Sequence, residues 1–411
     1  MNRLFASKRI FTGVLLAGLF SAGFAQQQPV LQLVESIPEE TILDNPDIPN
    51  APEVWAQMIQ NAQSTLEIEQ FYVSSQVGEA MEAVIRDIIA AAARGVKVRL
   101  IADKKMYRTY PEFIDILGKI PNIETRLIDF GAIARGIQHA KFFIADGKDM
   151  FLGSQNFDWR ALTHIHELGL RIRHTGIIDI YREVFALDWN LAGAGANASA
   201  VAVPHRSYRL PFRVFDGEAD TIIFFPTYSP AGWIPDSTLW DEPNIVQLID
   251  KAKSEVYLQF LSYSAKGRGK ESSLALDDAV RRAAARGVKI RLIVADWSKG
   301  TEAVKSLKSL STLANVEVKF SSIPDWSKGY VPFGRVEHLK FIVADRRIFW
   351  LGTSNAERSY FYSSRNLGMI VSYKPMAERL AQIFLKGWFG PYTSLVQDGV
   401  DYPAREHGEK K

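Results

Sequence analysis

The sequence predicts an α/β protein made of two duplicated halves, each a mixed β-sheet flanked by helices, packed about a pseudo-twofold axis with one shared active site. Three observations lead to this prediction: a repeated order of helices and strands, a repeated motif of polar residues, and a linker-like segment between the repeats. With 411 residues, 47% of them hydrophobic and 23% charged, the chain has the composition of a globular protein with room for more than one core.

The first elements expected in each half are an amphipathic helix and a strand. The helices are predicted over residues 55–63 and 245–253, and the strands over residues 66–72 and 256–261. Only a few residues separate each helix from its strand, which favours a layered α/β arrangement.

An alanine-rich helix and an alternating strand follow in both halves. The helices are predicted over residues 81–94 and 274–286, and Gly95 and Gly287 end them because glycine readily takes the left-handed conformation of a helix C-terminus. A strand pattern begins directly after each glycine. This succession of helices and strands with short connections predicts parallel strands covered by helices.

Each half then carries the same string of polar residues. The two strings are His139-x-Lys141-x4-Asp146 and His338-x-Lys340-x4-Asp345. Because side chains alternate along a strand, the His and Lys of each string are expected on one face. The Asp of each string falls on the opposite face, where it is expected to bind backbone or neighbouring polar groups rather than a ligand.

A second short motif follows each string at the same distance. Gly153-Ser154-Gln155-Asn156 begins 14 residues after His139, and Gly352-Thr353-Ser354-Asn355 begins 14 residues after His338. Two His, two Lys and two Asn brought together across an interface would form a pocket of hydrogen-bond donors suited to a tetrahedral anion. A duplicated strand that merely keeps its sequence is the alternative, but His and Lys on one strand face are poor core residues.

The chain is expected to divide at a segment of small residues. The stretch Ala192–Ala200 offers little that a core could use, so the linker is placed there and just beyond. The expected parts are a signal peptide at residues 1–25, a first half at 26–195, a linker at 196–207, a second half at 208–395 and a polar tail at 396–411.

The first 25 residues indicate export from the cytoplasm. Arg3, Lys8 and Arg9 precede an apolar run that ends in small residues at Ala25, which is the order of a secretory signal peptide. The protein is therefore expected to be periplasmic or secreted. An uncleaved N-terminal membrane anchor is the alternative.

Composition and the remaining motifs exclude several kinds of site. The absence of cysteine rules out disulfides and a thiolate nucleophile, and a net charge of +3 is too small to indicate nucleic-acid binding by itself. His164-x-His166 lacks carboxylate companions other than Glu167, so exposed strand histidines are expected rather than a metal site. Gly267-Arg268-Gly269-Lys270 is expected to be a solvated basic loop rather than a phosphate-binding loop.

The paired strings and the following Gly-Ser/Thr-x-Asn resemble the signature of the phospholipase D superfamily, over roughly residues 30–390. Leu33–Glu39 and Gly153–Leu162, continued by Glu167-Leu168-Gly169, resemble a narrower branch. That branch holds the animal lysosomal 5′-exonucleases related to phospholipase D and the poxvirus envelope phospholipases. The chain departs from the lysosomal enzymes, which usually end the second string with Glu and rely on disulfides, because it has Asp345 and no cysteine.

The resemblance implies a phosphodiesterase that needs no metal or other cofactor. His139 and His338 would be the catalytic pair, with Lys141, Lys340, Asn156 and Asn355 binding the phosphate. Five further residues would hold these side chains in place without touching the substrate: Asp146, Asp345, Ser154, Thr353 and Glu167. By resemblance, Glu167 is expected to hold His139 and to make it the nucleophile, which leaves His338, beside the neutral Asn366, as general acid.

The resemblance implies single-stranded nucleic acid as the substrate, cut from the 5′ end. A phospholipase D or phosphatidyl transferase acting on glycerophospholipids is the alternative, and a non-catalytic phosphate-binding protein is a third possibility. No obligatory protein partner is expected, and the sequence leaves the oligomeric state open.

Overall fold

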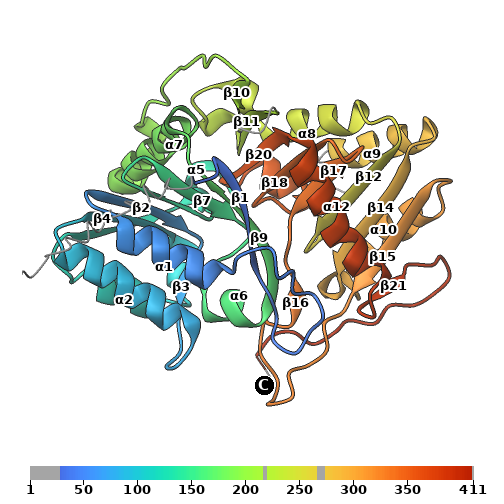
Figure 1. Ribbon diagram of the computed structural model, residues 1–411, viewed down its shortest axis with the longest axis horizontal. Coiled ribbons are helices and arrows are strands. Elements are labelled where there is room, and N and C mark those ends of the chain that lie inside the picture. The colour runs from blue at the N-terminus through green and yellow to red at the C-terminus, as the bar shows by residue number, and fades with distance from the viewer. Residues whose placement is uncertain (1–27, 216–219, 266–273, 410–411) are drawn as a thin grey trace, which may run out of the picture.

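The computed structural model describes residues 28–215, 220–265 and 274–409. The two halves lie side by side, the first drawn from blue to green and the second from yellow to red (Figure 1). The expected signal peptide, the Gly267–Lys270 loop and the last two residues of the expected tail fall outside the described residues. Within these ranges, no helix combines the length and the apolar character needed to cross a bilayer.

The sheet of the first half mixes parallel and antiparallel neighbours. Its strands lie in the order β1 (Leu31–Ser36), β9 (Ile165–Ile172), β7 (Asp149–Gly153), β6 (Phe142–Ala145), β2 (Thr65–Gln70), β4 (Lys97–Asp103) and β5 (Ile123–Ile128). The pairs β2/β4 and β4/β5 are parallel and the others are antiparallel.

The sheet of the second half repeats this order and adds a strand at each edge. Its strands are β10 (Phe212–Phe215), β11 (Thr221–Ser229), β20 (Asn366–Ser372), β18 (Ile348–Gly352), β17 (Phe341–Ala344), β12 (Glu255–Phe260), β14 (Lys289–Ala295), β15 (Val316–Ser321) and β21 (Thr393–Leu395). Two small parallel pairs flank the sheets, β3 (Val73–Ser74) with β8 (Phe157–Asp158) and β13 (Tyr263–Ser264) with β19 (Ala356–Glu357).

Helices cover both faces of each sheet. Those of the first half are α1 (Ala51–Asn61), α2 (Ala80–Ala93), α3 (Lys104–Tyr107), α4 (Glu112–Leu117), α5 (Phe130–Ala134), α6 (Trp159–Thr163) and α7 (Thr175–Ala194). Those of the second half are α8 (Asp241–Asp250), α9 (Ala275–Ala285), α10 (Ala303–Ser311), α11 (Arg358–Tyr362) and α12 (Lys374–Phe389), with short 3-10 turns at Gly195–Ala200, Ala231–Trp233, Ser237–Leu239 and Asp296–Ser298.

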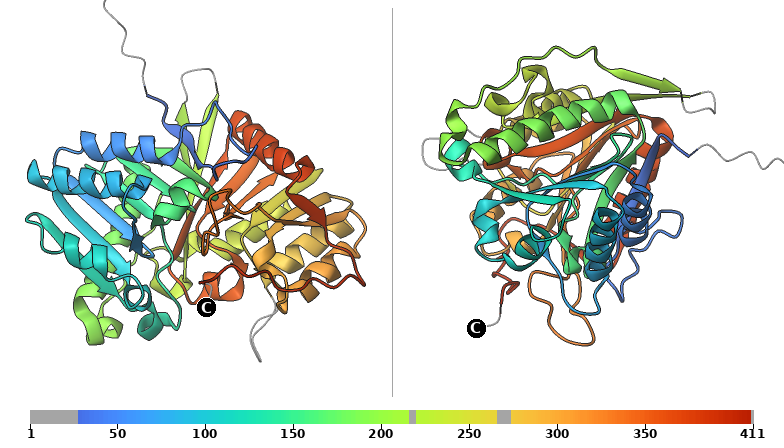
Figure 2. Two further views of the ribbon diagram at one scale, coloured as in Figure 1. Left: turned by 90° about the horizontal axis from the view of Figure 1, so that it is seen from below. Right: turned by 90° about the vertical axis from the view of Figure 1, so that its left-hand side faces the viewer.

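Three large apolar cores result from this layering. One lies under α1 and α2, and its counterpart lies under α8, α9 and α10. A third core is common to both halves, because α7 and α12 both contribute to it, with Phe185 and Phe384 among its fully buried residues. The shared core fixes the two sheets relative to each other. The left view of Figure 2 shows the two halves side by side from a second direction.

The predicted fold and its helix–strand repeats are confirmed. The strands expected over residues 66–72 and 256–261 are β2 and β12, and both alanine-rich helices are present as α2 and α9. Gly95 and Gly287, which were expected to end these helices, have φ angles of +98° and +89°. Both glycines therefore take the left-handed conformation that side chains disfavour.

The two sheets are joined by backbone pairing at the centre of the molecule. β16 (Val336–Glu337) belongs to the second half in sequence but pairs in parallel with β9 of the first half. An isolated bridge between Gln138 and Arg365 makes the equivalent connection in the other direction. Each half therefore extends a short strand into its neighbour, directly before its own repeated string.

Candidate active site

Each repeated string is anchored to the opposite half through the backbone of its histidine. The N–H of His139 donates to the carbonyl of Arg365 at 2.8 Å, and the N–H of His338 donates to the carbonyl of His166 at 2.8 Å. The strands β6 and β17 begin directly after the lysines rather than including the whole string. The strings are therefore held between two halves, at the ends of the central strands.

The partners of the two imidazoles are crossed between the halves. Nδ1 of His338 lies 2.8 and 3.0 Å from the carboxylate oxygens of Glu167, whereas Nδ1 of His139 lies 3.0 Å from Oδ1 of Asn366. The expectation that Glu167 holds His139 is wrong. Because β9 pairs with β16 of the second half, the residue that follows His166 on β9 faces the second imidazole rather than its own.

The surroundings of Asn366 fix the protonation of His139. Its amide nitrogen donates to the carbonyl of Tyr360 at 2.9 Å, and its oxygen also accepts from the hydroxyl of Thr353 at 3.0 Å. The amide oxygen must therefore face His139, so Nδ1 of that ring carries the hydrogen. A neutral His139 then has its lone pair on Nε2.

Two buried lysines complete the basic cluster. Lys141 and Lys340 are 0% and 1% exposed, and each ammonium donates to the carbonyl of the histidine in its own string, at 2.7 and 2.6 Å. Burial lowers the pKa of Lys340 to about 7 against the opposing charge of Glu167. Burial, reinforced by the charge of Lys340, also lowers the pKa of Lys141 well below its usual range.

Burial is the largest cause of the pKa shifts of both histidines and of Glu167. Burial and both lysines lower the pKa of His139 and of His338 well below the usual value. Burial raises the pKa of Glu167 to about 8, although Lys340 and Ser154 oppose the rise. With a pKa of about 8, Glu167 favours the protonated form at neutral pH. Because this proton lies between the carboxyl group and Nδ1 of His338, the other ring nitrogen, Nε2, carries a hydrogen.

The two asparagines offer unpaired polar atoms to a ligand. Asn156 and Asn355 are buried, and Oδ1 of each lacks a hydrogen-bond partner. Tyr360 bonds the side chain of Asn355 through its hydroxyl, and its ring lies edge-on to His139 with 4.9 Å between centroids. Both Oδ1 oxygens are acceptors and suit a hydrogen-bond donor, so only the amide nitrogens of these residues can donate to an anionic ligand.

Ser154 and Thr353 tie each motif to the neighbouring strand. The hydroxyl of Ser154 donates to the carbonyl of Leu168 at 3.2 Å and accepts from its N–H at 3.1 Å. Thr353 accepts equivalently from the N–H of Leu367 at 3.1 Å. Next to them, a Cβ at Gly153 would lie 2.7 Å from the Cα of Gly169, so only glycine allows these strands to approach.

Asp146 and Asp345 lie at the far ends of β6 and β17, in tight turns. Their φ angles are +54° and +52°, which Asp tolerates better than most residues. The carboxylate of Asp146 accepts from the N–H groups of residues 63, 64 and 65, and Asp345 accepts from those of residues 253, 254 and 255. Despite partial burial, these bonds hold the pKa of both groups below the usual value.

His164 and His166 are buried, so the expectation that they are exposed strand residues is wrong. His164 packs edge-on between Trp159 and Trp326, and Nδ1 of His166 lies 3.2 Å from Glu337. Among the residues that the structure describes, no group of three or more His, Asp or Glu side chains is placed to hold a metal ion.

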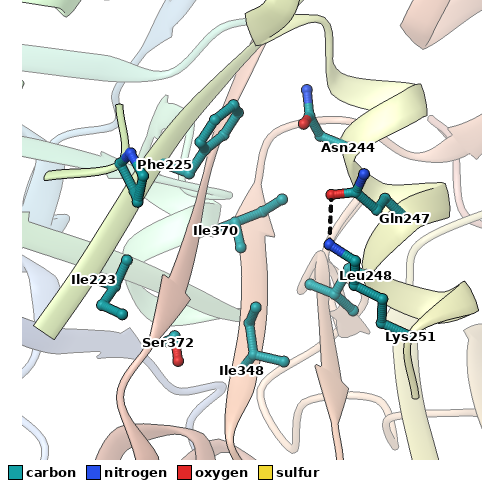
Figure 3. A pocket seen from close by; sticks show the side chains of 10 residues that line it. Ile223, Phe225, Asn244, Gln247, Leu248, Lys251, Ile348, Ile370 and Ser372 are labelled. Atoms are coloured by element: carbon teal, nitrogen blue, oxygen red, sulfur yellow. Dashed lines mark hydrogen bonds between the residues drawn. The ribbon is translucent and has the colours of Figure 1, made fainter. Parts of the chain in front are cut away.

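A cavity of about 200 Å³ lies away from this cluster, on the outer face of the second sheet (Figure 3). Apolar side chains such as Phe225, Ile348 and Ile370 line it, with Gln247 of α8 and Lys251, directly after that helix, at one side. It contains none of the basic groups described above. The chemistry of the molecule is therefore concentrated at the junction of the halves.

A duplicated α/β fold whose halves contribute matching His, Lys and Asn side chains to one cluster defines the class of two-motif phospholipase D-like proteins. The chain belongs to the family of phospholipase D-like domains described as "Cardiolipin synthase, PLD-like domain", which matches residues 55–189 and 245–388.

Similar proteins carry names from two areas of phosphodiester chemistry. The 5′-3′ exonuclease PLD3 of Rattus norvegicus is 28% identical over 408 residues, which cover 90% of this chain and 81% of the relative. The 5′-3′ exonuclease PLD4 of Homo sapiens is 27% identical over 406 residues, covering 88% and 78%. A probable phospholipase D of Caenorhabditis elegans is 28% identical over 396 residues, covering 88% and 70%.

Solved structures share the fold at low sequence identity. A phosphatidylserine synthase of Haemophilus influenzae superposes with a TM-score of 0.61 and 13% identity, over 84% of this chain and 85% of that one. A polyphosphate kinase of Porphyromonas gingivalis gives 0.57 and 13%, over 93% and 50%. These likenesses concern the fold alone.

Proposed function

We propose that the protein is a metal-independent phosphodiesterase that removes nucleotides from the 5′ end of single-stranded nucleic acid. The observation that carries this proposal is the crossed arrangement of the two imidazoles. One histidine faces a neutral amide and the other faces a carboxyl group, within one cluster of buried lysines and asparagines. This arrangement gives two histidines two different roles on one phosphorus atom.

The lysines and asparagines bind the phosphodiester. Lys141 and Lys340 each use one N–H on a backbone carbonyl, which leaves further N–H groups for the non-bridging oxygens. A bound phosphodiester brings negative charge next to the two lysines, which raises their pKa values and favours the protonated form of both amino groups. As charge shifts in the transition state, these donors stabilise the oxygens.

His139 acts as the nucleophile and His338 as the general acid. The lone pair on Nε2 of His139 attacks phosphorus, the bond to the leaving oxygen breaks, and Nε2–H of His338 supplies the proton to that oxygen. The resulting phosphohistidine is hydrolysed by a water that gives its proton back to His338. This is the assignment expected from sequence, but for another reason, since the carboxyl group of Glu167 supports the acid and not the nucleophile.

The names of the relatives support nucleic acid as the substrate. Proteins named 5′-3′ exonuclease align with about nine-tenths of this chain, including both motifs. A glycerophospholipid is the second candidate substrate, because a relative of equal identity is named probable phospholipase D.

The test compares the two substrates under identical conditions. Single-stranded DNA labelled at either end and phosphatidylcholine vesicles are incubated with the purified protein in EDTA, with a His139→Ala, His338→Ala double variant as control. We expect mononucleotides from the 5′ end of the DNA and no free choline. Choline release without DNA degradation would show that the substrate is a phospholipid. Activity that EDTA abolishes and that Mg²⁺ or Zn²⁺ restores would overturn the metal-free mechanism.

We further propose that the protein is exported and cleaved after Ala25. The support is the sequence of the first 25 residues, which have the order of a signal peptide. N-terminal sequencing of the mature protein should begin at Gln26. A membrane-bound protein that retains Met1 would show an anchor instead.

A further inference from the structure

Arg365 is a guanidinium enclosed entirely by protein at the junction of the halves. It is 0% exposed, and its Nε and Nη2 each lie 2.7 Å from an oxygen of Asp188, which is also 0% exposed. Nη1 donates to the carbonyl of Ser229 at 3.0 Å and Nη2 to that of Trp233 at 2.7 Å. Asp188 lies on α7 of the first half, so the ion pair crosses between the halves.

The backbone of Arg365 touches the chain on both sides of Gln138. Its N–H donates to the carbonyl of Ile137 at 2.9 Å, and its carbonyl accepts the N–H of His139 at 2.8 Å. The next residue, Asn366, holds the imidazole of His139 through Nδ1. Immobilising the guanidinium therefore fixes both the backbone and the ring partner of His139.

A second buried carboxyl group closes a ring of contacts around Gln138. The side-chain amide of Gln138 donates to Glu69 at 3.1 Å, and Glu69 lies beside Asp188. Burial, together with the negative charge of Asp188, raises the pKa of Glu69 well above its usual value, which favours the uncharged form of Glu69 beside the ion pair. One carboxylate and one guanidinium then balance each other in the ring.

The second half builds the same ring from different residues. Equivalent helices end in stacked pairs, Phe185 with Trp189 on α7 and Phe384 with Trp388 on α12, which aligns Asp188 with Gly387. Gln138 of the first half faces Arg365 of the second half, and Glu337 of the second half faces His166 of the first half.

The contacts within the second ring are also equivalent. Glu337 bonds His166 at 3.2 Å and Gln259 at 2.6 Å. A Cβ added to Gly387 would lie 3.6 Å from Oε1 of Glu337. In each ring a carboxyl group therefore lies next to a basic residue of the opposite half. Asp188 pairs with Arg365 in the first ring and Glu337 with His166 in the second, where Gly387 takes the place of Asp188.

We propose that Asp188 and Arg365 are positioning residues that hold His139 in line with the phosphorus atom. The proposal rests on the proposed function, and adds that the nucleophile is oriented by an ion pair which never touches substrate. A guanidinium with two bonds to one carboxylate and two more to backbone carbonyls has a single arrangement. The carbonyl of Arg365 accepts the N–H of His139, and the side chain of the next residue, Asn366, bonds its Nδ1. A fixed Arg365 therefore also restricts the imidazole of His139.

The test uses Arg365→Lys, with Arg171→Lys as matched control. Arg171 is a second buried arginine that binds Asp149 through two nitrogens, at 2.9 and 2.6 Å, but away from the site. We expect Arg365→Lys to lower kcat about 10- to 100-fold with KM within about threefold, because misplacing a reacting group by about 1 Å costs about 100-fold. Arg171→Lys should change kcat less than about twofold at a similar loss of melting temperature.

A second readout separates this proposal from the proposed function. In the resting protein, the ¹⁵N spectrum of His139 should show the Nδ1–H tautomer, and Arg365→Lys should mix in the other tautomer. If Arg365→Lys does not fold, the double variant Asp188→Leu, Arg365→Met removes both charges together and should fold, yet show the same loss of kcat. Normal kcat and an unchanged tautomer in either variant would overturn the proposal, even if the protein proves to be an exonuclease.

Discussion

His139 and His338 occupy equivalent places in the two halves, but one imidazole faces Asn366 and the other faces Glu167. The backbone bonds that anchor the two histidines have the same length, and both lysines bond the preceding histidine carbonyl in the same way. The imidazole partners differ, and His139 also packs edge-on against the rings of Phe71 and Tyr360. Under the proposed mechanism, duplication supplied two similar copies of the string, and the change of imidazole partner separates the nucleophile from the general acid.

The largest expected effect comes from removing either imidazole. His139→Ala and His338→Ala should each lower kcat on DNA by about 10⁴-fold or more, as loss of a nucleophile or its proton donor does in other enzymes. A p-nitrophenyl phosphodiester distinguishes them, because its leaving group needs no proton. With this substrate His338→Ala should still form a phosphohistidine and then stall, whereas His139→Ala should form none, as checked by mass spectrometry after rapid quenching. An adduct on residue 338 would reverse the two roles.

Exchanging the partners should alter both roles less severely. Glu167→Gln removes the carboxyl group that supports the acid and should lower kcat about 10- to 100-fold. Asn366→Asp adds a negative charge beside His139 and raises its pKa, so the acidic limb of the kcat/KM profile should move to higher pH. A limb that stays in place in Asn366→Asp would show that His139 is not the group that must be neutral.

Binding of an anion should be accompanied by uptake of protons. Burial lowers the pKa of Lys340 to about 7, and the negative charge of a bound dianion raises it, so above pH 7 binding is accompanied by uptake of a proton. Calorimetric titration with sulfate at pH 8, in two buffers of different ionisation enthalpy, measures this uptake. Lys340→Met should reduce it, and equal heats in both buffers for the unmodified protein would contradict the lowered pKa.

The smallest effect is expected at the two aspartates, which should behave alike. Asp146→Asn and Asp345→Asn weaken bonds to three backbone N–H groups each, and should lower the free energy of unfolding by about 1 to 3 kcal/mol with kcat little changed. Because both native pKa values lie below the usual value, this stabilisation is present at neutral pH and is lost as the pH falls through the native pKa. Denaturant titrations at pH 7 and pH 3 provide the measurement, and a large loss of kcat would place the aspartates in the reaction.

Local patterns in the sequence predicted the elements that carry the site. Helix periodicity and Gly95 and Gly287 identified α2 and α9, and the repeated strings identified the residues that meet at the junction. The partner of each imidazole could not be predicted in this way. It depends on β16 crossing to β9, a pairing between segments about 170 residues apart that no local pattern encodes.

Burial of polar residues was the other point at which local reasoning failed. His164 follows a strand-like pattern, but Trp159 and Trp326 enclose it from both halves. Asp188 and Arg365 were missed for the same reason, since each looks like an ordinary surface charge in its own segment. Alignment of the halves contained a signal, because a change to Gly387 in place of Asp188 accompanies the change from Arg365 to His166.

The backbone pairing between the halves also determines how the enzyme can move. Hinged separation of the two halves would break the backbone bonds from His139 to Arg365 and from His338 to His166, next to both imidazoles. We therefore expect substrate to bind and products to leave while the two halves stay paired. The amide hydrogens of the two histidines should consequently exchange with solvent only on global unfolding.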